Sequence, residues 1–435
     1  MSGTQRWTVR DLRRGNRAEV LRTLYFRGVS HRQEIIARTG LSAATVSNVT
    51  ADLIADGVVI EAGQEESEGG RPRILLKVDP EHRYLIGVDV GEPQVQVELF
   101  DLAMRPRATA TRPLPRNGAT PAAVARAIRS GVVEVLALGG IDPERVLGIG
   151  VGHPGIVEQG EPELVHARTL GWDQVPLQSM LVDSLREEGL HLPILTDNAA
   201  KTMGRAELLF GAGRGARDAV VVLIGSGVGG CVVADGVPYQ GTSGSAGEWG
   251  HTTVTVGGRL CRCGALGCLE AYVGAEAILS RCREAAASAV PGQASDITAP
   301  VGTPSAPGIV CIPSTPGVPA ALAALVAAAE HDGVERATID ETLAYLGAGL
   351  GSLINLFNPE RIVLGGWAGL LLGRGRLDAI RAATGRIALA RPFGQVEIRL
   401  GELGSDAVAM GSASLVLERF LDFAHSASGA RRPLG

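Results

Sequence analysis

Residues 261–270 read CRCGALGCLE, and this stretch begins ten positions after His251. It places three thiols, Cys261, Cys263 and Cys268, within eight residues, and the glycines between them allow the backbone to fold back on itself. Structural zinc takes four nitrogen or sulfur ligands in a closed tetrahedron. The three thiols and His251 therefore predict a structural Zn²⁺ site; the alternative is that the thiols are incidental.

The same ten residues, with GEWGH at residues 247–251 ahead of them, resemble the signature of the ROK family of bacterial repressors and sugar kinases. The pattern Cys-x-Cys-Gly-x-x-Gly-Cys-x-Glu is matched at every fixed position, and the resemblance extends from about residue 15 to about residue 420. It implies an α/β body of two lobes with the actin-like (ribonuclease-H-like) fold. Family kinases bind sugar and ATP in the cleft between such lobes.

The composition is that of a globular protein with more than one domain. A chain of 435 residues, 45% hydrophobic and 20% charged, is too long for one core. Its polar, arginine-rich start shows no signal peptide, and glycines interrupt its longest apolar stretches, so we expect a cytoplasmic protein without a membrane span. Six cysteines, three of them clustered, favour metal binding over a disulfide framework.

The N-terminus is basic although the whole chain carries a net charge of −5. Residues 1–40 contain nine arginines against three carboxylates, a pattern typical of a nucleic-acid-binding module. Apolar spacing predicts a helix over residues 16–26, and a second helix should begin after Ser30 as N-cap, with Glu34 near the capping-box position, and end at Gly40. A third helix should follow Ser42, which completes a helix-turn-helix.

Two short strands, residues 58–61 and 74–78, predict a wing whose tip carries Arg71 and Arg73 for phosphates or a narrow minor groove. The outward face of the third helix is small and hydroxylic, with one amide that suits adenine. Most of the DNA affinity should therefore come from arginine–phosphate contacts. The alternative is a helix-turn-helix that binds only protein. The residues expected to contact bases are Ser42, Ala43, Ala44, Thr45, Ser47 and Asn48.

The remaining chain alternates apolar strands with glycine turns, which is an α/β pattern. Such strands are expected near residues 84–91, 146–151, 220–224 and 362–364. Between Pro291 and Pro319 lie seven of the 23 prolines, which predicts a low-complexity insertion before a helix over residues 320–329. The predicted domains are residues 1–79 (winged helix-turn-helix), 80–196 (first lobe) and 197–420 (second lobe, with the zinc loop and a Pro/Ala-rich insertion near 285–320).

The resemblance also implies a sugar site. Gly155, Asn198, Glu248, His251 and Glu270 stand where the family grips hexose hydroxyls, and His251 would use one ring nitrogen for zinc and the other toward the sugar. The alternative for Glu248 and Glu270 is a solvated or helix-capping carboxylate.

Two departures from the family kinases predict a body without catalysis. The first phosphate loop, Asp-x-Gly-Gly-Thr in the kinases, here ends in Glu92 and Pro93, which places a carboxylate where phosphate would approach. The kinase motif Glu-Asn-Asp-Ala-Asn aligns with residues 197–201, so that Ala199 replaces the aspartate that accepts the sugar proton. A methyl group cannot act as a base, and losing a general base costs about 10²–10⁴ in rate. With that negative charge lost and Lys201 two residues further on, the site suggests a sugar 6-phosphate or another anionic group as ligand. The alternative is that Lys201 is a solvated helix residue.

Together these features predict a transcriptional regulator, more specifically a repressor of carbohydrate genes, that binds a double-stranded DNA operator as a homodimer or dimer of dimers. A sugar or sugar phosphate in the cleft would control it. One alternative is an ATP-dependent, glucokinase-like sugar kinase with a regulatory DNA-binding arm. Another is a metal sensor, which the closed ligand set disfavours.

Overall fold

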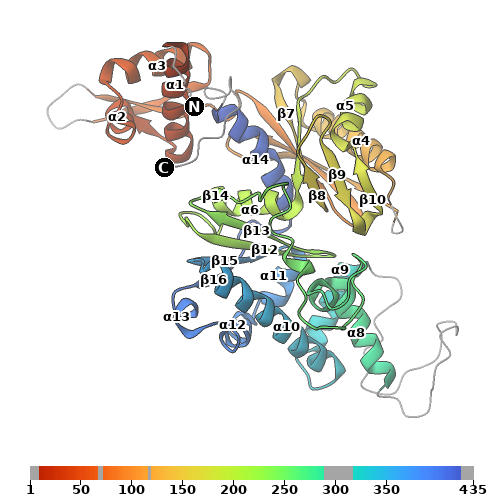
Figure 1. Cartoon of the computed structure of the whole chain (residues 1–435). Coiled ribbons are helices and arrows are strands. Elements are labelled where there is room, and N and C mark those ends of the chain that lie inside the picture. The colour runs from red at the N-terminus through yellow and green to blue at the C-terminus, as the bar shows by residue number, and fades with distance from the viewer. Residues whose placement is uncertain (1–8, 67–71, 116–118, 289–316, 423–435) are drawn as a thin grey trace, which may run out of the picture.

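The computed structural model describes residues 9–66, 72–115, 119–288 and 317–422, and arranges them as an N-terminal arm beside two lobes, each built around a sheet (Figure 1). The lobes lie one above the other in this view, and the arm lies to one side. This arrangement confirms the predicted α/β fold with an N-terminal helix-turn-helix.

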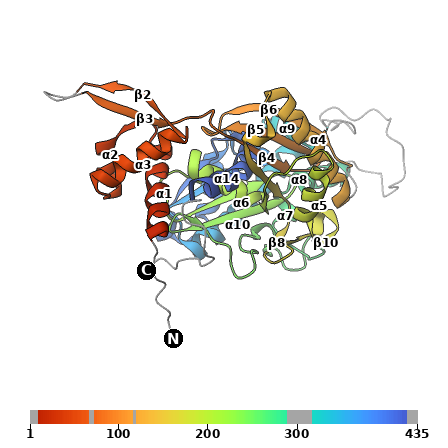
Figure 2. The ribbon, with the colours of Figure 1, turned by 90° about the horizontal axis from the view of Figure 1, so that it is seen from above.

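The arm is a winged helix-turn-helix. Its helices surround a buried cluster that includes Val20, Leu24, Ile35, Val46 and Leu53. The sheet has the order β1-β3-β2, and its β2–β3 hairpin extends away from the helices (Figure 2). The elements are α1 (Val9–Arg27), β1 (Ser30–His31), α2 (Arg32–Thr39), α3 (Ala43–Ala55), β2 (Val59–Glu65) and β3 (Arg73–Val78).

Two predictions about the arm need correction. The first helix begins at Val9, not at residue 16. The N-cap of α2 is His31, not Ser30: its Nδ1 accepts the Glu34 N–H at 3.2 Å, and the Glu34 carboxylate accepts the His31 N–H at 3.0 Å. The reciprocal bonds between His31 and Glu34 set the start of the helix one residue later than predicted. Sheet pairing does not distinguish the two candidates, since Ser30 pairs with Leu76 and His31 with Leu75. Ser42 does cap α3, as predicted.

The two lobes repeat one sheet topology, typical of the ribonuclease-H-like fold. Each sheet has three consecutive antiparallel strands followed by two strands that run parallel to the first, in the orders β11-β7-β4-β5-β6 and β14-β13-β12-β15-β16. The strands of the first sheet are β4 (Tyr84–Val90), β5 (Gln94–Asp101), β6 (Pro106–Pro113), β7 (Val146–His153) and β11 (Ile194–Asn198), and those of the second are β12 (Ala219–Ile224), β13 (Val228–Ala234), β14 (Val237–Pro238), β15 (Arg361–Gly365) and β16 (Glu397–Leu400).

Helices and a small second sheet cover the first lobe. Helices α4 (Pro121–Gly139) and α5 (Leu177–Arg186) pack into its core, and a three-stranded sheet lies at its edge. The strands of this small sheet are β8 (Ile156–Glu158), β9 (Leu164–Ala167) and β10 (Trp172–Val175), and two short 3-10 helices, η1 (Pro143–Arg145) and η2 (Arg168–Leu170), complete the lobe.

The second lobe is mostly helical around its sheet, with a separate core. The helix expected at residues 320–329 is present, whereas most of the proline-rich insertion lies outside the described residues. The elements around the sheet are η3 (Trp249–His251), α7 (Glu270–Val273), α8 (Ala275–Ser288), α9 (Val318–Ala328), α10 (Val334–Phe357), α11 (Trp367–Gly373), α12 (Leu377–Gly385), α13 (Ala390–Phe393) and η4 (Gly404–Asp406).

Two helices, α6 (Ala199–Phe210) and α14 (Ala407–Asp422), lie between the lobes and pack against each other. Helix α14 crosses the first-lobe sheet so closely that a Cβ on Gly150 would stand 1.7 Å from the Ser412 carbonyl oxygen, so only glycine fits there. The domain limits stay a prediction, and this packing argues for counting residues 407–422 with the first lobe.

Candidate functional site

The zinc loop, which we define as residues 251–270, is a tight double turn at the surface of the second lobe. Backbone bonds close it, from the Cys261 N–H to the Ala265 carbonyl and from the Gly267 N–H to the Arg259 carbonyl. Gly267 has a φ of 79°, and a Cβ there would lie 1.7 Å from the Thr255 carbonyl oxygen. The loop therefore needs glycine at this position in order to turn back toward His251.

The four predicted metal ligands converge in one cluster. Their ligand atoms all lie within 4.8 Å of one another, with 3.7 Å between Cys261 Sγ and His251 Nδ1 and 3.8 Å between Cys263 Sγ and Cys268 Sγ. Two thiolates bound to one zinc ion at about 2.3 Å stand about 3.8 Å apart at the tetrahedral angle. The donor set and its spacing therefore fit a tetrahedral metal ion, and the cluster could hold one.

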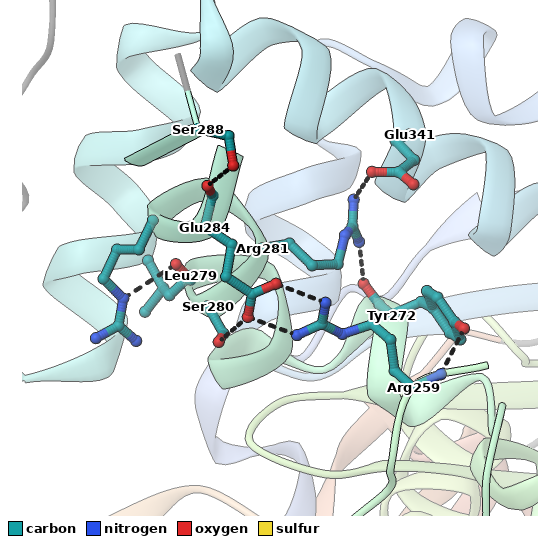
Figure 3. A network of polar contacts seen from close by, with 9 residues as sticks. Arg259, Tyr272, Leu279, Ser280, Arg281, Glu284, Ser288 and Glu341 are labelled. Atoms are coloured by element: carbon teal, nitrogen blue, oxygen red, sulfur yellow. Dashed lines mark hydrogen bonds and ion pairs between the residues drawn. The ribbon is translucent and has the colours of Figure 1, made fainter. Parts of the chain in front are cut away.

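Helix α8 supports the loop through a network of arginines (Figure 3). The Arg259 guanidinium binds both oxygens of Glu284, at 2.7 and 2.8 Å, and the Arg259 N–H donates to the Tyr272 hydroxyl at 2.9 Å. Buried Arg281 donates to the Tyr272 carbonyl at 2.6 Å and to Glu341 at 2.8 Å. The base of the loop is thereby fixed to α8 and α10.

The predicted sugar residues of the second lobe lie beside the metal cluster. His251 turns Nδ1 toward Cys261 and Nε2 toward the Glu248 carboxylate, at 3.9 Å. Burial raises the pKa of Glu248, and its electrostatic interactions with His251 and Lys201 oppose the rise. Glu270 is buried; it accepts the Val228 N–H at 2.9 Å and lies 3.6 Å from Cys261 Sγ. Its carboxylate thus braces the loop.

The predicted sugar residues of the first lobe also meet. Asn198 caps α6, since its Oδ1 accepts the N–H groups of Ala200 and Lys201, and its Nδ2 donates to the Gly155 carbonyl at 2.8 Å. Gly155 has a φ of 92° and touches β9 so closely that a side chain would clash with Ala167. This corner is therefore rigid before any ligand arrives.

Lys201 does not offer a free ammonium for a phosphate. Its side chain is buried, and Nζ donates to the Gln240 side chain at 2.9 Å and to the Gly244 carbonyl. Burial lowers the pKa of Lys201, and the carboxylates of Asp197 and Glu248 counteract this effect. Lys201 instead ties α6 to the loop that leads to Glu248, which argues against the 6-phosphate hypothesis.

Of the positions that depart from the kinase pattern, Glu92 has an ion-pair partner in the other lobe and Ala199 begins a helix. The Glu92 carboxylate forms an ion pair with Arg262 of the zinc loop at 2.7 Å, across the two lobes, and the Ser226 hydroxyl donates to the Glu92 carbonyl at 3.4 Å. Ala199 is the first residue of α6, directly after the Asn198 cap. No pattern in the sequence indicates the partner of Glu92, because Arg262 lies at a variable position of the signature.

The candidate DNA-reading face is the exposed side of α3. Ala43, Ala44, Ser47 and Asn48 are exposed. Thr45 is half-buried, and its hydroxyl bonds that of Ser42 at 2.9 Å while the Ser42 oxygen also accepts the Thr45 N–H. The bond between the hydroxyls of Ser42 and Thr45 uses one of their two O–H donors, so the pair keeps one donor for DNA. Ser47 and Asn48 supply the other exposed polar side chains of this face.

On the wing, Arg73 is exposed and its guanidinium lies 3.4 Å from His31 Nε2. Arg71 lies outside the described residues. Within the described ranges, every helix is too short or too polar to cross a lipid bilayer.

A family model described as ROK family matches residues 85–419. The chain is 28% identical over 413 residues to a xylose repressor of Caldicellulosiruptor bescii, a match that covers 95% of this chain and 98% of the relative. It is 33% identical over 275 residues to a glucokinase of Halalkalibacterium halodurans, which covers 63% of this chain and 77% of the relative. The likeness to the repressor thus extends over nearly the whole chain.

Among solved structures, the crystal structure of a ROK family transcriptional regulator, a homolog of the E. coli MLC protein, has a TM-score of 0.75 at 22% identity. The match covers 95% of this chain and 97% of that chain. It supports the fold of the arm and of both lobes together.

Proposed function

We propose, from the premise that this chain belongs to the ROK family, that it is a transcriptional repressor whose affinity for an operator is controlled by a sugar in the cleft between the lobes. The observation that carries the proposal is the combination of a winged helix-turn-helix with a two-lobed ROK family body. The family resemblance further implies that Ala199, the first residue of α6, replaces the proton acceptor of the kinases. The near full-length likeness to a xylose repressor supports the same reading.

For the sugar, we propose the residues that line the two rigid corners of the cleft. Glu248 and His251 can accept and donate hydrogen bonds to vicinal hydroxyls, while Gly155 and Asn198 shape the opposite corner. Glu270 acts mainly by holding the Gly227–Val228 turn and Cys261 in place. A neutral sugar is favoured over a sugar phosphate because the Lys201 ammonium already has two partners.

For the metal cluster, we propose a structural Zn²⁺ ion held by His251, Cys261, Cys263 and Cys268. Zinc in such a closed set supplies rigidity rather than reactivity. Ligation at Nδ1 would fix the His251 ring so that Nε2 stays directed at Glu248 and the sugar. This reading disfavours a metal sensor, which would need an exchangeable ion.

For DNA, we propose that Asn48 and Ser47 contact bases and that Arg73 and Arg71 contact the backbone or the minor groove. We also propose a homodimer, because two recognition helices one helical turn apart would match a palindromic operator. Because such a protein acts on the chromosome, we place it in the bacterial cytoplasm.

The proposal includes the absence of sugar phosphorylation. Ala199 offers no base, and the Glu92–Arg262 ion pair puts a carboxylate at the turn where phosphate would need to approach. The likeness to a glucokinase favours the competing function, a sugar kinase with a regulatory arm.

One experiment separates these two functions. DNA fragments retained by the purified protein are selected and sequenced, and operator affinity is measured by fluorescence anisotropy with and without D-xylose or D-glucose. A repressor should lose about 5- to 150-fold in affinity with its sugar, and it should release no ADP from ATP with either sugar. Glu248→Gln should keep operator binding but lose the sugar response. Sugar-dependent ADP release, or no operator recovered, would contradict the proposal.

A further inference from the structure

We propose that α14 is the element that couples the sugar cleft to the DNA-binding arm, with Arg205 as the positioning residue at its cleft end. The direction of this signal rests on the proposed function. Three sets of contacts support this role of α14. It forms a buried ion-pair junction with α6, its backbone crosses closely over the first-lobe sheet, and it makes an ion pair and apolar contacts with α1.

The cleft end of the coupling is the Arg205 junction. The Arg205 guanidinium binds Glu418 of α14 at 2.7 Å and lies 3.7 Å from Asp197, which directly precedes Asn198. The side chains of Arg205 and Asp197 are only 17% and 13% exposed. Asn198 caps the same helix that carries Arg205, so a ligand that moves this cap moves the junction with it.

The middle of α14 is held against two neighbours. A Cβ on Gly411 would stand 1.8 Å from the Thr202 carbonyl oxygen of α6, which shows how closely the two helix backbones approach. Ala413, Val416 and Leu417 are buried in the core that the arm and the body share. Since packed interiors resist continuous deformation, α14 should shift as a rigid rod rather than bend.

The end of α14 that contacts the arm lies one helical turn beyond Glu418. The Arg22 guanidinium of α1 binds Asp422 at 2.6 Å. Leu421, also on this last turn, belongs to the same buried cluster as Leu21 and Leu24 of α1. Figure 1 shows α14 running from beside the arm toward α6, so one helix touches both parts (Figure 1).

Glu418 and Asp422 connect α14 to the two parts of the molecule. They are four residues apart on one helix face, and one binds the cleft helix while the other binds the arm. A change in the angle between α6 and α14 when the cleft closes would therefore reposition α1 and the recognition helix behind it. Coupling of this kind needs a discrete element that both sites bias, and α14 fits that requirement.

The first test needs neither sugar nor operator. Amide hydrogen exchange of residues 17–27 is compared between the wild type and Arg205→Met. The control Arg376→Met removes an arginine with the same 17% side-chain exposure that also binds a glutamate, Glu330, at 2.7 Å. This pair joins the N-cap of α12 to the segment after α9 in the second lobe. We expect exchange in α1 to be faster by about 2- to 30-fold for Arg205→Met and unchanged for the control.

If the arm of Arg205→Met exchanges like that of the wild type, α14 does not transmit and the inference is overturned. Should Arg205→Met fail to fold, Glu418→Gln preserves the shape of the junction and carries the same expectation. Arg205→Lys keeps the charge and should restore most of the protection of the α1 amides against exchange. If Arg205→Lys and Arg205→Met lost the same amount of protection, Arg205 would act only through packing, which would also count against the inference.

The second test measures coupling directly with the selected operator and the sugar that releases it from the wild type. Arg205→Met should keep the affinity for sugar and the affinity for operator each within about threefold, while the sugar-induced loss of operator affinity falls by about 2- to 30-fold. Retained coupling would refute the proposal. A wild type without sugar response would refute the proposed function instead, and the exchange test would still decide the role of α14.

Discussion

At the scale of single residues, the metal cluster makes the sharpest prediction. Cys268 is fully buried and lies 3.8 Å from Cys263 Sγ. The protein as purified should contain about one zinc ion per chain, and Cys268→Ser should lose it together with thermal stability, because metal binding contributes to folding. Metal analysis and a melting curve measure both effects.

The matched control for this variant is Cys282→Ala. Cys282 is also a buried free cysteine, but it lies on α8, outside the ligand cluster. It should lose some packing energy and keep its zinc. If Cys268→Ser kept a full complement of zinc, the cluster would not be the metal site.

A second prediction concerns Glu98, whose side chain is buried on β5. Burial raises its pKa to about 7, and the nearby carboxylates of Asp406 and Asp89 add to the rise, while a hydrogen bond from Gln96 opposes it. In the folded state Glu98 therefore keeps its proton up to about pH 7, whereas in the unfolded chain it loses it near 4.5. Its contribution to stability is greatest below pH 4.5 and falls as the pH rises toward 7.

Glu98→Gln should remove this pH dependence, with a gain on the order of 2–3 kcal/mol at pH 7 relative to the wild type. Urea unfolding at several pH values measures it, and Glu144→Gln on an exposed glutamate provides the control. A parallel fall in stability for Glu98→Gln and the wild type would show that Glu98 ionises normally.

At the scale of elements, the proposed recognition helix α3 offers few polar side chains for contacts with DNA bases. Because Asn48 carries the amide of the exposed face of this helix, base discrimination should rest mainly on Asn48, with Ser47 and the remaining O–H donor of the Ser42–Thr45 pair as further contacts. Asn48→Ala should cost about 1–3 kcal/mol of discrimination at one base pair. Arg73→Ala on the wing should instead weaken binding to all sequences and reduce the salt slope by about one.

Binding titrations at several salt concentrations, on the operator and on scrambled DNA, distinguish these two roles. Ala51→Ser, an exposed change farther along α3, provides the control for Asn48→Ala. If Asn48→Ala weakened both DNAs equally, Asn48 would contact the backbone and not a base.

At the scale of the whole molecule, the arm and the body share one core. Val20 and Leu24 of α1 belong to the same buried cluster as Phe100 of the first lobe and Leu417 of α14. The arm should therefore not unfold independently of the first lobe. Leu417→Ala should destabilise both by about 2–5 kcal/mol.

Calorimetry combined with hydrogen exchange of α1 and β5 tests this prediction, with Leu372→Ala in the separate core of the second lobe as control. The control should leave α1 protected. Independent melting of the arm, unaffected by Leu417→Ala, would show that the shared core contributes little.

Much of the site could be predicted from local sequence. The metal ligands lie within 18 residues of one another, the cap at Ser42 is local, and the strands and glycine turns of both lobes follow from apolar runs and their breaks. Such features depend on backbone geometry over a few residues, so a pattern is sufficient to predict them. Ser30 failed as a cap because the capping box forms between His31 and Glu34, and histidine is not among the residues usually preferred as an N-cap.

The sequence by itself therefore determined the metal cluster, the helix-turn-helix and the alternation of strands and helices. Only the tertiary structure decided which charges meet: Glu92 with Arg262, Lys201 with Gln240, and Arg205 with Glu418. These partners are 39 to 213 residues apart in the chain. Their pairing depends on how lobes and helices pack, and long-range packing leaves no periodic mark on the sequence.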